Sequence, residues 1–209
     1  MSKRERKIGV AVSGLLATGM FMGLLTLLTF KSTPAIAHVV PSPCDFTTGG
    51  GFVITDQGSH ANFGLVGGCK HGGFFGHVNF VDHDTTGFFA GLHVSSTSID
   101  GYFEPAPGPP PSGYRDICGT ANTNLPPPND TGIKVRVRTK DNGEPGTGVD
   151  RFGIKLANPR TGASAVVVST RFLAGGNIQL HKPNPSTTGP SVPPDEITAC
   201  GSDDSGLGF

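Results

Sequence analysis

Glycine or proline interrupts nearly every stretch of this chain beyond residue 37 before the stretch reaches helical length. Of the 32 glycines in the sequence, 28 lie in that part. Both residues destabilise a helix interior, and no window there shows a sustained apolar period of about 3.6 residues. Short apolar or alternating runs between turn residues are typical of a β-sandwich or barrel. The sequence therefore predicts an all-β fold, a single antiparallel β-sandwich or barrel-like domain of about eight strands.

The clearest strand signal is IKVRVRT, residues 133–139. Three β-branched residues alternate there with three basic residues, so one face of the strand is apolar and the other is charged. Proline cannot donate to a sheet ladder, so the proline-rich segments 104–113 and 125–130 are predicted to be surface loops. The predicted strands are 51–55, 61–66, 76–82, 92–99, 133–139, 151–156, 165–169 and 177–181.

The first 37 residues have the three parts of a secretory signal. A basic start precedes a stretch without charge at residues 8–30, and small residues Ala35 and Ala37 flank Ile36 at the exit. We expect a signal helix that is cleaved after Ala37, which makes the protein secreted or attached to the cell surface, with no membrane insertion after cleavage. The alternative is an uncleaved N-terminal membrane anchor, because about 20 apolar residues suffice to span a bilayer.

Beyond this leader the chain carries 11 basic and 15 acidic side chains, a formal net charge of −4. A mildly acidic protein without a basic run has little electrostatic affinity for nucleic acid or for anionic lipid. We therefore expect no nucleic-acid partner, and a partner, if any, in the cell envelope or outside the cell.

All four cysteines lie beyond the leader, and an even count in an exported chain is typical of structural disulfides. No pair has the C-x-x-C spacing of a redox site or the spacing of a zinc finger. Four cysteines allow three connectivities; we favour Cys69 with Cys118, and Cys44 with Cys200 joining the two ends of the domain.

The chain from residue 183 to residue 209 is polar and almost free of large apolar side chains. Such a segment buries too little apolar surface to offset its ordering entropy. The sequence therefore predicts one β-sandwich domain at residues 44–182, followed by a disordered tail at 183–209 that is tethered through Cys200.

Several motifs, read in order, resemble those of the post-COAP domain, a small exported bacterial β-domain. They are TTGGGFVI, GSHANFGLV, GVDRFGIKLANPRTGASAVV and GGNIQLHK, and together they span residues 47–182. The chain departs from that family at residues 118–124, where it reads CGTANTN in place of a strand motif rich in glycine and threonine. The resemblance implies a β-sandwich module and no established enzyme activity.

A histidine-rich hairpin gives the sharpest metal hypothesis. If residues 76–82 pair with 92–99, His77 and His93 point away from the apolar face, and His83 follows in the turn. Two imidazoles on adjacent strands with a third ligand from the turn suit zinc or copper. The alternative is that these histidines are exposed polar positions of an ordinary hairpin.

Two acidic turns could supply the oxygen ligands that calcium prefers. They are residues 82–86 (DHDTT) and 141–144 (DNGE), and neither matches the calcium-binding loop of an EF-hand. Other acidic residues occur singly in turns, where aspartate bonds to the local backbone.

No G-x-S-x-G motif and no recognisable catalytic spacing of serine, histidine and acid occurs. We therefore expect a non-enzymatic, exported β-domain acting in cell-surface structure, adhesion or binding. The alternatives are a metal-binding extracellular protein that uses the histidine cluster and a carbohydrate-binding module. The absence of tryptophan removes the usual stacking platform of the latter.

Overall fold

The computed structural model describes residues 38–105 and 113–209, so the predicted leader and its cleavage after Ala37 lie outside the described residues. The described chain contains nine strands and one short helix. The elements are β1 (Phe46–Ile54), β2 (His60–Lys70), β3 (Gly73–Asp82), β4 (His93–Phe103), β5 (Tyr114–Thr123), β6 (Ile133–Lys140), β7 (Arg151–Asn158), β8 (Ala163–Phe172), β9 (Gly175–His181) and α1 (Glu196–Cys200). In this part of the chain, no helix has the length and apolarity needed to cross a bilayer.

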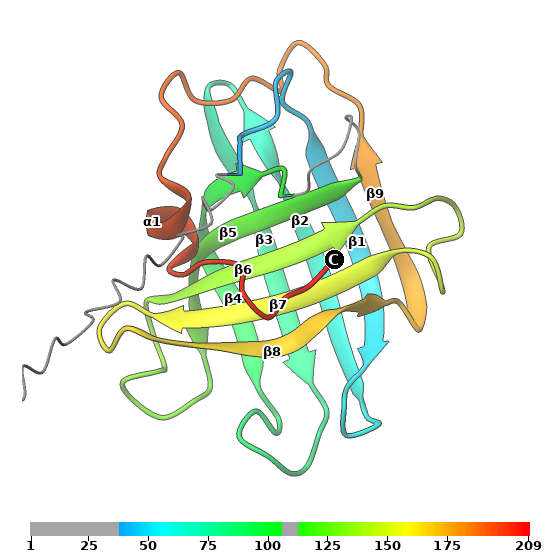
Figure 1. Cartoon of the computed structure of the whole chain (residues 1–209), viewed down its shortest axis with the longest axis vertical. Coiled ribbons are helices and arrows are strands. Elements are labelled where there is room, and N and C mark those ends of the chain that lie inside the picture. The colour runs from blue at the N-terminus through cyan, green and yellow to red at the C-terminus, as the bar shows by residue number, and fades with distance from the viewer. Residues whose placement is uncertain (1–37, 106–112) are drawn as a thin grey trace, which may run out of the picture. The chain divides into compact units, whose positions relative to one another are not determined.

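The nine strands form one antiparallel sheet in the order β8-β7-β6-β5-β4-β3-β2-β1-β9. The sheet curls into a half-barrel, and β5–β8 cross in front of β1–β4 (Figure 1). Each of the eight predicted strands overlaps an observed one, so the all-β antiparallel class is confirmed. The two halves of the curled sheet face each other as the layers of a sandwich do, although they belong to one continuous sheet.

The core lies between these two halves. Phe152 of β7 stacks on Phe63 of β2 with 4.1 Å between ring centroids, and it lies 6.1 Å from Phe80 of β3. All three rings are nearly excluded from solvent. Stacked aromatic pairs contribute about 0.5–1.5 kcal/mol beyond the area that they bury. These contacts between strands far apart in sequence hold the curled halves together.

Strand β5 was not predicted, although it lies inside the sheet between β6 and β4. Its residues Arg115 and Asp116 are both buried, at 2% and 0% exposure, so polar residues stand where a periodicity argument expects apolar ones. The segment CGTANTN, which departs from the family pattern, forms the second half of this strand up to Thr123. Consecutive strand residues point to opposite faces, so Arg115 and Asp116 serve two different buried clusters.

The predicted disulfide pairing is wrong. The structure joins Cys44 to Cys69 and Cys118 to Cys200. Pairing of β1 with β2 brings Cys44 next to Cys69, whose amide donates to the carbonyl of Asp45. Cys118 points to the outer side of β5, where α1 lies, and therefore away from Cys69 in the core. Two disulfides indicate an oxidising, extracytoplasmic environment.

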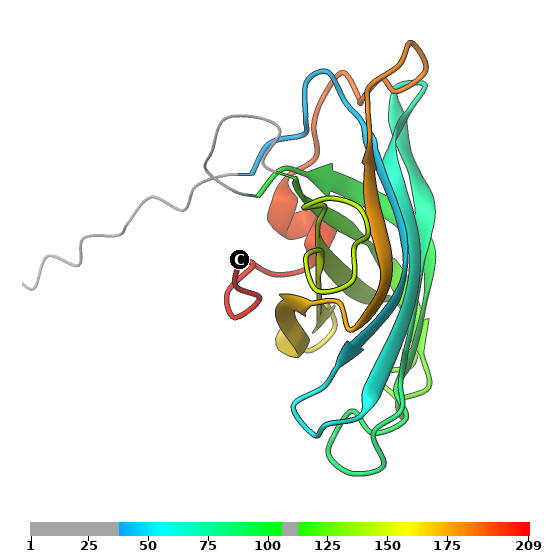
Figure 2. The same ribbon diagram turned by 90° about the vertical axis from the view of Figure 1, so that its right-hand side faces the viewer.

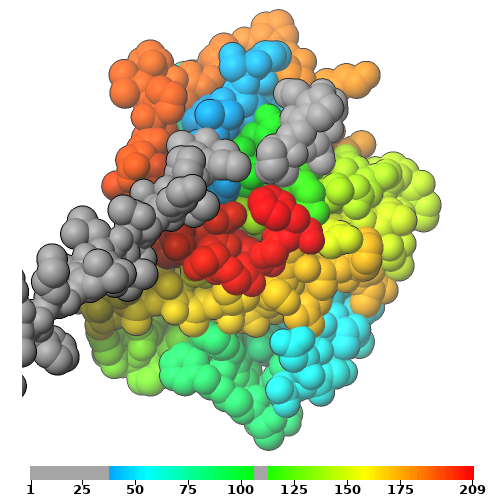
Figure 3. Space-filling view, viewed as in Figure 1, coloured from blue at the N-terminus to red at the C-terminus, as the bar shows by residue number. Residues whose placement is uncertain are grey.

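The prediction of a disordered tail is also wrong. The segment after β9 runs back along the domain to α1, and residues 201–209 then continue over the outer face of β5–β7 (Figures 2 and 3). Cys200 and Leu207 are buried at 1% and 0% exposure. We call residues 195–209 the C-terminal strap. Buried basic side chains of the sheet hold it, and composition does not reveal them.

Candidate functional site

The half of the sheet formed by β9 and β1–β4 has an outer side that no described segment covers, at the right of Figure 2. We call it the open face. Alternation along each strand and the burial pattern identify its outward residues. They are Asn177, Gln179 and His181 of β9, Phe46, Thr48, Gly50 and Phe52 of β1, His60, Asn62, Gly64, Val66 and Lys70 of β2, Phe75, His77, Asn79 and Val81 of β3, and His93, Ser95 and Thr97 of β4.

Two glycines at the middle of the open face are not explained by the fold. Gly50 and Gly64 are direct cross-strand neighbours. A Cβ at Gly64 would meet nothing within 4 Å, and a Cβ at Gly50 would meet only the Phe63 carbonyl oxygen at 3.6 Å. By contrast, a Cβ at Gly51 would lie 2.1 Å from the Gly175 carbonyl oxygen. Glycine in a strand costs stability, and it often marks a place where a ligand or another backbone approaches closely.

Polar side chains flank this bare backbone on both sides. The strand registers place Asn177, Gly50, Gly64, Asn79 and Ser95 in one row across five strands. Asn79 and Ser95 are exposed, whereas the Asn177 side chain already bonds to the Gly146 amide and to Glu144. Amide and hydroxyl groups both donate and accept hydrogen bonds, so the row offers both functions to a ligand.

Stacked ring pairs lie at the two ends of β1. Phe46 stacks on His181 with 4.2 Å between centroids, and Phe52 stacks on His60 with 4.6 Å. Six residues of strand separate the two phenylalanines, a distance of about 20 Å. The open face is therefore a long surface with a bare, polar middle and an aromatic pair at each end.

The structure does not bring the three predicted zinc or copper ligands together. His93 pairs with Val81, four residues along β3 from His77, which separates the two histidines by about 13 Å. His83 lies beyond the end of β3, where its amide donates to the His60 carbonyl. Residues 76–82 do pair with 92–99 as predicted, but the register places His93 opposite Val81 and not opposite His77. His77 and His93 do share the open face, as predicted.

The two predicted calcium turns use their carboxylates for backbone hydrogen bonds. Asp82 accepts from the Asp84 amide, and Asp141 accepts from the amides of Gly143 and Leu180. Burial, together with the nearby Asp84 carboxylate, raises the pKa of Asp82. In the described chain neither turn belongs to a group of three ligand side chains with converging donor atoms.

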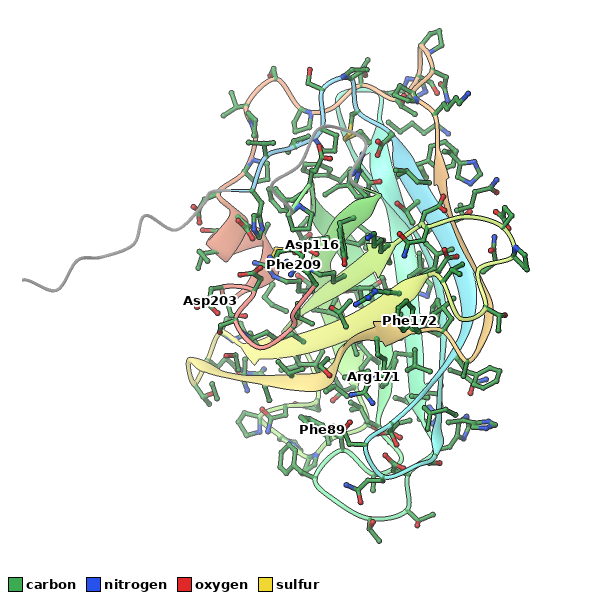
Figure 4. The ribbon with its side chains drawn as sticks, turned by 45° about the vertical axis from the view of Figure 1, so that its right-hand side comes forward. Phe89, Asp116, Arg171, Phe172, Asp203 and Phe209 are labelled. Carbon is green, nitrogen blue, oxygen red and sulfur yellow. A yellow bond between two sulfur atoms is a disulfide. The ribbon has the colours of Figure 1, made fainter. Side chains whose placement is uncertain are left out.

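The opposite side of the sheet holds a buried charged cluster that sequence reasoning missed. Asp116 of β5 accepts two hydrogen bonds from Arg138 and one from Arg136, each of 2.8 Å. Strap residues complete it: Glu196 lies 2.5 Å from Arg136, and Asp204 lies 2.8 Å from Arg138. Figure 4 shows Asp116 on the side of β5 that faces the strap. The predicted outward orientation of the two arginines is correct, but the strap buries them completely.

His38, at the start of the described chain, joins this cluster. Its Nδ1 lies 2.7 Å from Glu196 Oε1, and its backbone nitrogen donates to Glu196 Oε2 at 3.2 Å. Burial raises the pKa of Glu196, but hydrogen bonds from His38 and Arg136 lower it more, to about 2. Burial acts to lower the pKa of Arg138. Its hydrogen bonds to Asp116 outweigh this effect, so the pKa lies above its ordinary value.

His38, Asp116 and Glu196 are the one group of described residues whose donor atoms lie close enough together for a metal ion, within 4.8 Å. Arg136 and Arg138 already occupy the carboxylates, and their guanidinium charges would repel a divalent cation. The group is therefore better described as an ion-pair network than as a metal site.

A second buried network stabilises the other end of the domain. Both carboxylate oxygens of Asp45 accept hydrogen bonds from Arg115, and Oδ1 also accepts from the Tyr102 hydroxyl at 2.7 Å. Burial, followed by the adjacent Asp45 charge, raises the pKa of Tyr102. All three side chains are engaged with one another, so the network is structural.

An apolar cavity of about 200 Å³ lies between Phe88, Phe89 and Leu156. Ligand pockets typically measure about 300–1,000 Å³. Phe88 is 74% exposed, so the cavity opens to solvent. Its size supports at most the insertion of a single side chain, and the open face remains the larger candidate site.

Comparison with protein-family models, with curated proteins and with solved structures finds no match. The resemblance to the post-COAP domain therefore stays a prediction, and the site is the feature that bears on function.

Proposed function

We propose that this protein is an exported, non-enzymatic binding module whose open face binds an extended, uncharged polysaccharide of the cell envelope or the extracellular space. The observation that carries the proposal is the pair Gly50 and Gly64. A Cβ atom would fit at both positions, and strand propensity alone disfavours glycine there. A bare backbone lets a flat ligand approach the sheet directly.

The charge of the open face favours a neutral ligand. Lys70, at one end, is the formally charged side chain among the outward residues named above. At the margins of the open face, Asp100 of β4 is paired with Lys134, and Glu144 accepts a hydrogen bond from Asn177. The middle holds asparagine, serine and threonine, whose hydrogen-bonding capacity matches that of sugar hydroxyl groups. The centre of a protein interface is instead enriched in aromatic side chains, methionine and arginine.

The extent of the open face favours a polymer. Neighbouring strands lie about 4.8 Å apart, so the row from Asn177 to Ser95 spans about 20 Å. The ring pairs at the ends of β1 are about as far apart in the other direction. Several sugar rings fit on a surface of this size, whereas a monosaccharide would cover only part of it.

A binding role fits the carboxylates better than a catalytic role does. Asp116, Asp141 and Asp150 each accept hydrogen bonds from arginine or from backbone amides. Glycosidases, by comparison, need two carboxylates that flank a substrate. Export is supported by the two disulfides and by the leader that the sequence predicts.

Cosedimentation with insoluble cellulose, chitin and xylan tests the proposal. We expect the purified protein to bind at least one of these polymers, and the Gly50→Thr/Gly64→Thr variant to bind at least about tenfold more weakly. Threonine is a good strand former, so the variant should keep its melting temperature. Ala163→Thr, which adds the same side chain at an exposed position of β8 in the other half of the sheet, serves as the matched control.

Two results would refute the proposal. One is a wild-type protein that sediments with none of the three polymers or only with charged ones. The other is an equal affinity of the double variant and the wild type. A loss of binding in Ala163→Thr would show that binding depends on another part of the surface.

A further inference from the structure

The charged cluster has one more carboxylate than it has permanently charged cations. It contains three carboxylates, from Asp116, Glu196 and Asp204, and two guanidinium groups, from Arg136 and Arg138. Asp116 and both arginines have side chains with 0% exposure, and Glu196 has 14%. A buried carboxylate without a full countercharge is costly, because the protein interior screens charge weakly.

The backbone nitrogen of His38 lies at the place where a further cation would act. It is 3.2 Å from Glu196 Oε2, while Arg136 occupies Oε1 of the same carboxylate. The His38 side chain is itself only 7% exposed. Its Nδ1 lies 2.7 Å from Oε1 and its Nε2 lies 3.8 Å from Asp204, so the ring contacts both strap carboxylates and forms ion pairs with them only when it is protonated. The backbone nitrogen approaches the other oxygen of Glu196.

We propose that removal of the leader after Ala37 creates the missing charge, and that the new α-ammonium group of His38 forms a buried ion pair with Glu196. Hydrolysis of the Ala37–His38 peptide bond by a leader peptidase of the exporting cell consumes one water. It leaves a carboxylate on Ala37 and an amine on His38. With an ordinary pKa of about 7.7–8.0, the amine holds a proton at neutral pH.

The site selects an ammonium over a divalent metal ion. A metal would need the amine to lose its proton, and it would lie beside the guanidinium of Arg136. An ammonium adds the single charge that balances three carboxylates against two guanidinium groups. Hydrogen bonds between charged partners are also the stronger kind.

Processing would then complete the packing of the C-terminal strap. In the uncleaved chain the His38 nitrogen is an uncharged amide with one hydrogen to donate. After cleavage it is a cation that joins the N-terminus to α1, the helix that Cys118–Cys200 attaches to β5. This inference rests on leader cleavage and not on polysaccharide binding, so either proposal can fail without the other.

The test uses the full chain expressed with its own leader in a secreting host. Intact mass and N-terminal sequencing give the first residue of the exported protein, which we expect to be His38. An amine-acylating reagent at neutral pH then measures the reactivity of the α-amine. We expect it to react at least about tenfold more slowly in the folded protein than in urea, because its ion pair holds the proton that acylation must remove.

Glu196→Gln should restore most of that reactivity without changing the first residue. Asp203→Asn is the matched control, because it removes a strap carboxylate that bonds to Lys155 and leaves His38 and Glu196 in place. An exported protein that starts at another residue would overturn the proposal. So would equal labelling of the folded and unfolded chains, or a protected α-amine in Glu196→Gln.

Discussion

The two outer sides of this curled sheet differ in charge and in cover. On β5–β7 the outer side carries buried Asp116, Arg136 and Arg138, and the C-terminal strap covers it. On β9 and β1–β4 the outer side carries glycine, amide and hydroxyl groups, and no described segment lies over it (Figure 2). The strap neutralises charges that would otherwise be exposed. The open face carries Lys70 as an exposed charge at one end, and its middle is uncharged and available to a ligand.

This contrast separates stability from binding. Buried ion pairs become strongly destabilising when one partner is lost, whereas an open polar surface tolerates substitution. Changes on the covered side should therefore unfold the protein, and changes on the open face should affect binding alone.

Loss of the strap disulfide should have the largest effect. Cys118–Cys200 closes a loop with a sequence separation of 82, against 25 for Cys44–Cys69. Loop-closure entropy gives about 4.5 kcal/mol for the first disulfide and about 3.5 kcal/mol for the second. Urea unfolding of the Cys118→Ala/Cys200→Ala and Cys44→Ala/Cys69→Ala variants measures both. A larger loss for the second pair would contradict the strap's role.

Removal of the Asp116 carboxylate should cause the next largest loss of stability. Asp116→Asn leaves Arg136 and Arg138 buried beside a neutral amide, which should lower the free energy of unfolding by about 3 kcal/mol. Asp203→Asn, whose carboxylate is 66% exposed, should lower it by less than about 1 kcal/mol. Urea unfolding at neutral pH checks both values, and similar losses in the two variants would show that the cluster is not the main attachment of the strap.

Alanine substitutions should distinguish a glycine that the core crowds from a glycine on the open face. A Cβ at Gly67 would lie 2.6 Å from the Ile117 side chain in the core, so Gly67→Ala should cost about 1–3 kcal/mol. Gly64→Ala should instead raise stability by about 0.5 kcal/mol, because it only restricts the unfolded chain. Thermal unfolding of both variants tests this. A destabilised Gly64→Ala would mean that the fold, and not a ligand, requires glycine there.

Acid should remove the contribution of the Glu196 carboxylate to the stability of the folded protein. Its pKa is lowered from 4.5 to about 2 in the folded protein, so the carboxylate stabilises the fold above about pH 4.5 and loses this effect as the pH falls toward 2. The stability difference between wild type and Glu196→Gln should be constant between about pH 5 and 7 and shrink below pH 5. Unfolding curves between these limits provide the measurement, and a difference independent of pH would contradict the ion pair.

The sequence predicts the fold class well because most strands follow simple alternation. In β6, Val135 and Val137 point into the core, as expected. Strand β5 escapes prediction because Arg115 and Asp116 are buried by partners far away in the chain. The order of the C-terminal strap could not be predicted for the same reason, because it depends on Arg136, Arg138 and a disulfide rather than on the composition of the strap.

The candidate site could be predicted only in part. Alternation places His77 and His93 on the outer side of the sheet, but their separation depends on the register, which the turn determines. The role of Gly50 and Gly64 depends on the space around each glycine, and a sequence does not show which glycines in a rich stretch are crowded.

The most direct test of the contrast between the two outer sides is a nuclear magnetic resonance titration of the labelled, exported protein. The probe is a soluble oligosaccharide of whichever polymer binds in cosedimentation. We expect chemical-shift changes at Asn62, Gly64 and Asn79 of the open face, and unchanged signals from Ala199 and Leu207 of the strap. Changes concentrated in the strap, with the open face unaffected, would contradict the account.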